Sequence, residues 1–295
     1  MCLQPDRPRA TSRKNNMGRS RCAVRSGLAE LGGSMKYRTN FWAGIGMAIL
    51  LAASGAASGL LAPSAAKAGI LMVSMEEELD FKRVADDPLV YLSELDLIRA
   101  FYLAGEALLE IEGGRGTASM MFTEPFFEGY ADLEPVLEAR GAAPFGDEMM
   151  TAIDLADEDV PVAEVKAAVG KVYAALDAAE KVAPKNNRDR LQAEVTLTAI
   201  MLARAAKQYE MALSPTGPDE AWVDGYGIWK AAEHRSNGLM PKLKGVNEEL
   251  AAELASARKV FGDVYKSVKE PKTTKANANA LRTASSRVSE RAKSR

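Results

Sequence analysis

Aromatic side chains recur at helical spacing in the second half of this chain. Trp222, Tyr226 and Trp229 fall at positions i, i+4 and i+7, so they would share one face of a helix. Such a face could line a pocket for an apolar or aromatic ligand, although packing between helices is the simpler interpretation. The candidate ligand-binding residues are these three aromatics together with Glu124, Glu128 and Tyr130.

The residues that usually carry catalysis are scarce. His234 is the only histidine, so neither a histidine metal cluster nor a His-Glu-x-x-His helix can form. No Gly-x-Ser-x-Gly elbow accompanies the serines that follow residue 69. We therefore predict a protein that is not an enzyme, with His234 as a surface residue.

Residues 35–68 have the pattern of a secretory signal peptide. Lys36 and Arg38 precede an apolar run over 41–61, and a small-x-small cleavage pattern ends at Ala68. We expect Sec-type export to the periplasm, cleavage after Ala68 and no transmembrane span afterwards. An uncleaved membrane anchor is the alternative, because the run is long enough to cross a bilayer.

Residues 1–34 match neither a signal peptide nor a folded segment. They are rich in Arg, Ser, Gly and Pro, and we expect them to be a non-native extension ahead of a start at Met35. A targeting peptide is the alternative interpretation. Both cysteines, Cys2 and Cys22, lie in this stretch, so the mature protein would contain no disulfide.

Charge is distributed unevenly along the chain. Residues 69–265 contain 19 Lys and Arg against 36 Asp and Glu, whereas residues 266–295 contain 9 against 2. The acidic body argues against nucleic-acid binding, which needs a basic surface. The stretch 269–295 has few large apolar residues, so we predict a disordered basic tail that could contact anionic surfaces.

Helix-forming residues dominate the body, and strand-like alternation is absent. We predict an all-α bundle of about six to seven helices over 69–268. Its halves would cover about 86–182 and 187–268. The expected helices run from Pro88 to about Leu109, 117–140 with a bend at Pro125, 144–157, 161–182, 187–213, 218–239 and 241–268.

The two halves could be an internal duplication. The segment 126–133 aligns with 222–229, and Gly-Tyr is identical in both. Chance similarity is the alternative, because the aligned stretch is short.

Three short motifs carry a resemblance to a known group of proteins. The runs 91–108, 121–125 and 129–135 are similar to an uncharacterised group of exported, all-helical proteobacterial proteins, loosely like imelysin-type periplasmic bundles. The resemblance implies a metal or redox-related role built on histidines, but Ala100, Phe101, Met121 and Thr123 occupy the region where those histidines would stand. The oxygen ligands that remain for a divalent cation are Glu106, Glu124, Glu128 and Glu134.

These features predict an exported, non-enzymatic binding or accessory protein that handles an envelope metal or a small ligand. The alternative is a structural or protein-interaction module of the cell envelope. A polar-lined pocket would favour the first prediction, and an exposed apolar patch would favour the second. No cofactor is expected beyond a divalent cation held by carboxylates.

Overall fold

The computed structural model describes residues 83–185, 189–271 and 278–293, all of which belong to one compact unit. Within these ranges the chain is helical and contains no strand, which confirms the predicted all-α class. The expected extension, signal peptide and cleavage site lie outside the described residues.

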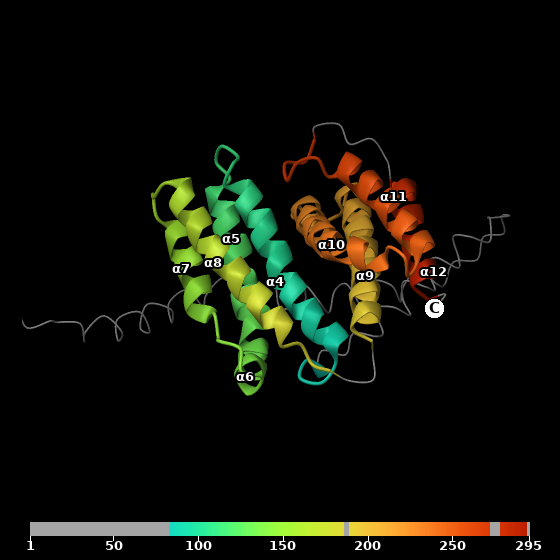
Figure 1. Ribbon diagram of the computed structural model, residues 1–295. Helices are drawn as coiled ribbons and strands as arrows, with labels where there is room; N and C mark the ends of the chain where they lie inside the picture. The colour runs from blue at the N-terminus through green and yellow to red at the C-terminus, as the bar shows by residue number, and fades with distance from the viewer. Residues whose placement is uncertain (1–82, 186–188, 272–277, 294–295) are drawn as a thin grey trace, which may run out of the picture. The chain divides into compact units, whose positions relative to one another are not determined.

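Helix α4 (Pro88–Leu108) is the central element of the described fold. Asp87 caps its start by accepting a hydrogen bond from the Leu89 N–H at 2.9 Å, and Pro88 occupies the first turn. Most of its residues are buried, including several that are polar. Helices α5, α8, α9 and α10 all pack against α4, which therefore joins the two halves of the chain (Figure 1).

The first half continues in one long interrupted helix. Helix α5 ends at Pro125, where a bend was predicted, and a π-helical turn follows it directly. Proline has no amide hydrogen for the helical ladder, which favours an irregular turn at this point. Gly141, at φ 74°, ends the helix as predicted. The elements of this half are α5 (Arg115–Pro125), η4 (Phe126–Tyr130), α6 (Ala131–Ala139), α7 (Gly146–Asp157) and α8 (Val162–Lys181).

The second half contains α9 (Arg190–Ala212), α10 (Ala221–Leu243), α11 (Glu248–Val264) and α12 (Ala278–Lys293). The predicted helix boundary at Pro241 is wrong, because α10 continues through this proline to Leu243. The chain instead turns at Gly245, whose φ is 78°. Asn247 then caps α11 by accepting from the Leu250 N–H at 3.0 Å.

Residues 278–293 correct the prediction of a disordered tail. They form helix α12, which packs against α9 and α11. Leu281, Ser285, Val288 and Ala292 recur at helical spacing and are buried. The buried face of this helix consists mainly of small residues beside Leu281 and Val288. A composition with few large apolar residues was therefore a misleading sign of disorder.

The conformations of the two Gly-Tyr segments differ. Gly129 and Tyr130 lie in the π-helical turn, whereas Gly225 and Tyr226 lie in regular α-helix near the start of α10. The internal duplication therefore remains a hypothesis.

None of the helices in the described ranges combines the length and the apolar character needed to cross a membrane. The apolar run 41–61, which raised the question of an anchor, is outside those ranges.

Candidate functional site

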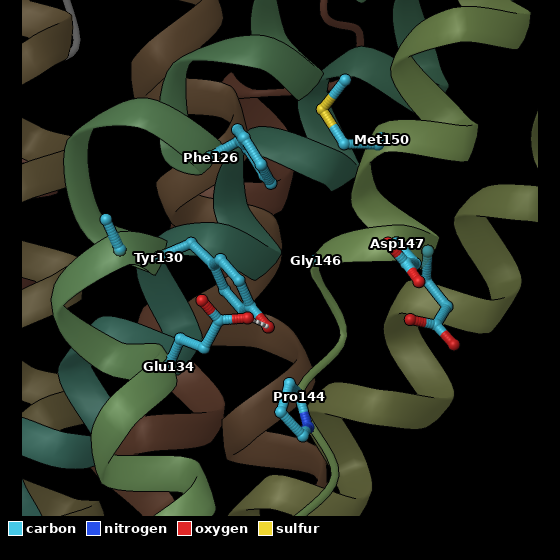
Figure 2. Close-up of a pocket in the computed structure, with 9 residues that line it drawn as sticks. Phe126, Tyr130, Glu134, Pro144, Gly146, Asp147 and Met150 are labelled. Carbon is cyan, nitrogen blue, oxygen red and sulfur yellow. Dashed lines mark hydrogen bonds between the residues drawn. The ribbon is translucent and has the colours of Figure 1, made fainter. Parts of the chain in front are cut away.

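A pocket of about 400 Å³ opens between the η4–α6 segment and the start of α7. Figure 2 shows Tyr130 and Glu134 on one side of it and Asp147 on the other. The loop that carries Pro144 lies between them and leads into α7 at Gly146. The lining residues are Phe126, Tyr130, Ala131, Glu134, Pro144, Gly146, Asp147, Glu148 and Met150.

Tyr130 links the two walls of the pocket. Its hydroxyl accepts a hydrogen bond from the Phe145 N–H at 2.6 Å and donates one to Glu134 Oε1 at 3.3 Å. Burial raises the pKa of Tyr130 to about 12, so the phenol stays protonated at neutral pH. The Tyr130 ring also packs on Phe126 and Phe145, with ring centroids 5.9 and 4.8 Å away. The π-helical turn thus holds the start of α7 through a side chain.

The pocket is acidic. Glu134 comes from α6, while Asp147 and Glu148 lie in the first turn of α7, and no lysine, arginine or histidine is among the lining residues. Acidic side chains in a first turn are commonly explained by the helix dipole. Glu134 also lies in the first turn of its helix, but it reaches the pocket from α6, so the acidic lining is brought together from two different helices.

Of the six predicted ligand-binding residues, Tyr130 lines this pocket. Trp222 instead packs on Tyr209 and Tyr265 and donates from Nε1 to the Ser267 carbonyl at 3.1 Å. Trp229 stacks on Phe261 of α11 at 5.5 Å. Both tryptophans are buried among helices of the second half, as the simpler interpretation of their spacing predicts.

The other members of the predicted set are also separate from one another. Tyr226 is half-buried on α10, where burial raises its pKa and Lys230, Glu233 and Glu106 contribute to the field around it. Glu124 lies in α5 and Glu128 in η4. Both α10 and η4 contact α4, but their other neighbours differ. The six residues are therefore not assembled around the pocket that Tyr130 lines.

The predicted cation ligands have different surroundings. Glu106 accepts a hydrogen bond from the Tyr173 hydroxyl at 3.1 Å and lies 3.6 Å from Lys166 Nζ. Glu134 instead receives the Tyr130 hydroxyl. No group of three or more Asp, Glu, His or Cys residues suited to a metal ion occurs in the part of the chain that the structure describes.

A buried ion pair, and the partly exposed network of ion pairs that extends from it, were not predicted. Arg235 of α10 forms a bidentate pair with Asp96 of α4, and its Nη2 lies 2.7 Å from Asp96 Oδ1. Arg235 Nη1 also lies 3.0 Å from Glu180 of α8. Further pairs extend this network, namely Glu180–Arg190, Arg190–Glu194 and Glu194–Lys242. The signal in the sequence was Asp96, a charged residue within an apolar helical stretch.

Glu94 is a second unpredicted residue with unusual electrostatics. It is half-buried on α4, and burial raises its pKa to about 7 against the opposing effect of Arg204. The nearby charge of Asp132 raises the pKa further. A β-carbon at Gly129 would lie 3.3 Å from Glu94 Oε2, so this carboxyl group is next to the π-helical turn.

His234 lies on the exposed side of α10, consistent with a surface residue. Partial burial and the Arg99 guanidinium lower its pKa.

Comparison of the chain with family models, curated proteins and solved structures finds no match. The resemblance to exported bundles of the imelysin type therefore stays a hypothesis.

Proposed function

We propose that this chain is an exported, non-enzymatic binding or accessory protein of the periplasm, and that its ligand site is the η4–α7 pocket. The observation that carries the proposal is a pocket in which a carboxylate from one helix faces two carboxylates from another beside aromatic rings. Its volume is within the range of small-molecule sites, roughly 300–1,000 Å³. Tyr130 supports both walls, so the site does not depend on a loop alone.

The proposal is tested by filling the pocket. Met150→Trp would place a bulky ring against the lining, whereas Met120→Trp adds the same ring at a side chain that is exposed and outside the lining. Both variants and the parent protein would be purified from the periplasm and analysed by native mass spectrometry for bound small molecules and metals.

We expect a bound species in the parent and in Met120→Trp, and its loss in Met150→Trp with the helical circular dichroism unchanged. A bound species that survives in Met150→Trp would place the ligand elsewhere and contradict the proposed site.

Two exposed apolar side chains favour a protein-interaction module as the second candidate function. Met120 and Phe127 are large apolar side chains in α5 and η4 that are 51% and 55% exposed. Exposed apolar side chains close in sequence can mark a protein contact. The double variant Met120→Ser with Phe127→Ser should abolish co-purification of an envelope partner if this candidate is correct, and leave small-ligand binding unchanged.

A further inference from the structure

From the lining of the η4–α7 pocket we infer that its ligand is a small organic cation, with an ammonium group and an apolar rim. This inference rests on the proposed function, because it assigns a ligand class to the same pocket. It also goes beyond the expected metal or unspecified small ligand.

Charge is the first argument. Glu134, Asp147 and Glu148 are all acidic, and within the described ranges none of them forms an ion pair with a lysine or arginine. Glu134 instead accepts a hydrogen bond from the neutral Tyr130 phenol. Three unneutralised carboxylates at one pocket attract a cation and repel an anion.

The helix end beside the pocket does not reverse this sign. The N-terminus of α7 carries a partial positive charge of roughly half a unit, which by itself would favour an anion. The Phe145 N–H, however, already donates to Tyr130, and Asp147 and Glu148 occupy the first turn. Two full negative charges outweigh this partial charge before Glu134 is counted.

Aromatic and thioether groups are the second argument. The rings of Phe126 and Tyr130 are nearly parallel, with an angle of 13° between their planes, and Phe126 remains half-exposed at the pocket. Met150 adds a polarizable sulfur to the lining. An ammonium group with methyl or methylene substituents is attracted to aromatic faces and also buries apolar surface there.

A bare metal ion fits the same lining less well. Hard cations need about six or more oxygen ligands within a short radius. Across the described ranges no cluster of three or more acidic, histidine or cysteine residues meets that need. The three carboxylates are distributed around a cavity of about 400 Å³, which suits a larger cation. Such a cation is attracted to the carboxylates electrostatically while the aromatic rings contact its substituents.

The test compares a cation with its neutral isostere. Binding of choline and of 3,3-dimethyl-1-butanol, which replaces the quaternary nitrogen by carbon, would be measured by isothermal titration calorimetry, with putrescine as a second cation and CaCl₂ as the metal probe. The variants are Glu134→Gln, which removes one carboxylate charge from the lining, and Phe126→Leu, which removes a ring. The matched control is Glu138→Gln, on the same helix α6 but exposed and outside the lining.

We expect at least one of the two organic cations to bind. If choline binds, its neutral isostere should bind about tenfold more weakly, because cation–π and carboxylate attraction together amount to roughly 1–2 kcal/mol. Glu134→Gln and Phe126→Leu should each weaken cation binding severalfold, and Glu138→Gln should leave it unchanged.

Three results would overturn the inference, and they separate it from the proposed function. Equal binding of choline and its isostere would show a pocket that binds ligands without selecting charge, so the function would stand and the ligand class would fail. Binding of Ca²⁺ alone, weakened by Glu134→Gln, would replace the organic cation by a metal. No binding of either organic cation at millimolar concentration would reject the ligand class, while the pocket-filling variant Met150→Trp would still test the function by native mass spectrometry.

Discussion

Asp96 and Arg235 illustrate how single residues connect distant parts of this chain. They lie 139 positions apart in sequence, and their side chains are 1% and 4% exposed. Two nitrogens of the Arg235 guanidinium donate to the two carboxylate oxygens of Asp96. Burial opposes the charged form of Arg235, yet the carboxylates of Asp96 and Glu180 raise its pKa. A buried pair of this kind adds little net stability over an apolar pair, but loss of one partner leaves a buried charge without compensation.

The first prediction concerns this pair. Asp96→Asn keeps the shape of the side chain and removes its charge, so we expect the free energy of unfolding to fall by about 3–5 kcal/mol. The measurement is urea denaturation followed by circular dichroism. Asp263→Asn, at the exposed pair with Lys259, is the control and should change stability by less than about 1 kcal/mol. Equal effects of the two substitutions would contradict the importance of burial.

The second prediction concerns Glu94 and pH. Its pKa is about 7 in the folded protein, above the ordinary value of 4.5. Between these values the folded state therefore binds more protons than the unfolded state, so this group lowers stability as pH rises toward 7. Glu94→Gln should remove that decline, and its stability relative to the parent should increase from pH 5 to pH 8.

Urea denaturation across this pH range measures the effect. Glu138→Gln serves as a control because Glu138 is an exposed residue on α6. A constant difference between Glu94→Gln and the parent at all pH values would reject the shifted titration.

At the scale of elements, helices α4 and α10 approach each other closely at a glycine. A β-carbon at Gly227 would lie 2.5 Å from the Ala100 carbonyl oxygen and 3.0 Å from Ala104 Cβ. The obstructing group is backbone, so it cannot be relieved by a change of rotamer. Close approach of these helices brings Arg235 and Asp96 within reach of each other.

The third prediction compares two glycines of the same helix. Gly227→Ala should destabilise the protein by about 1–3 kcal/mol, because α4 and α10 must separate to admit the methyl group. Gly238→Ala meets no atom within 4 Å and should stabilise by about 0.5–1 kcal/mol through helix propensity. Thermal unfolding of both variants gives the test, and two effects of the same sign would contradict the close-approach argument.

The fourth prediction concerns helix α12. Leu281 is fully buried in it, so Leu281→Ala should cost about 2–5 kcal/mol if α12 belongs to the cooperative fold. The exposed Arg287→Ala on the same helix should change stability by no more than about 0.5 kcal/mol. Guanidinium denaturation would show this difference. A negligible effect of Leu281→Ala would instead mean that α12 unfolds before the other helices.

At the scale of the whole molecule, the basic C-terminal segment partly neutralises the acidic body. Arg282 of α12 lies 3.0 Å from Glu210 of α9, and Arg291 forms an ion pair with Glu249 of α11. These two arginines are thus occupied within the chain. A contact between this segment and an anionic surface would have to compete with its own body.

The fifth prediction concerns the path of the whole chain to its compartment. If residues 35–68 are a cleaved signal peptide, the protein recovered from the periplasm should begin at Gly69, as intact mass spectrometry would show. Ala68→Phe should block cleavage, because it replaces a small residue of the recognition pattern. Lys67→Gln, between the two small positions, should have no effect. A mature protein that begins elsewhere would refute the predicted site.

Helix positions in this protein were largely predictable because their signals are local. Asp87 and Pro88 start a helix, and Gly141 ends one, through their effect on the neighbouring turn alone. Both boundaries occur in the structure where the sequence predicts them. Pro241 was misleading because it lies in the last turn of α10 and the helix continues past it to Leu243. The amphipathic spacing of α12 was present in the sequence, but an average composition concealed it.

The candidate site was predictable only in part. Tyr130 and Glu134 were expected to contribute to binding or metal chemistry, and both line the pocket. Asp147 and Glu148 were not selected, because acidic residues at a helix start have an ordinary explanation in the dipole. Their approach to Glu134 depends on the angle between α6 and α7, which no short motif encodes.

The helical class, most helix ends, the scarcity of catalytic groups and the expectation of export follow from the amino-acid sequence alone, because composition and caps act over a few residues. The folded chain was needed to show that Trp222 and Trp229 are packing residues and that Arg235 pairs with Asp96. It was also needed to show that three carboxylates share a pocket with Phe126 and Tyr130. Burial and charge pairing depend on which helices become neighbours. In the described residues, α4 makes much of that choice, because α5, α8, α9 and α10 all pack against it.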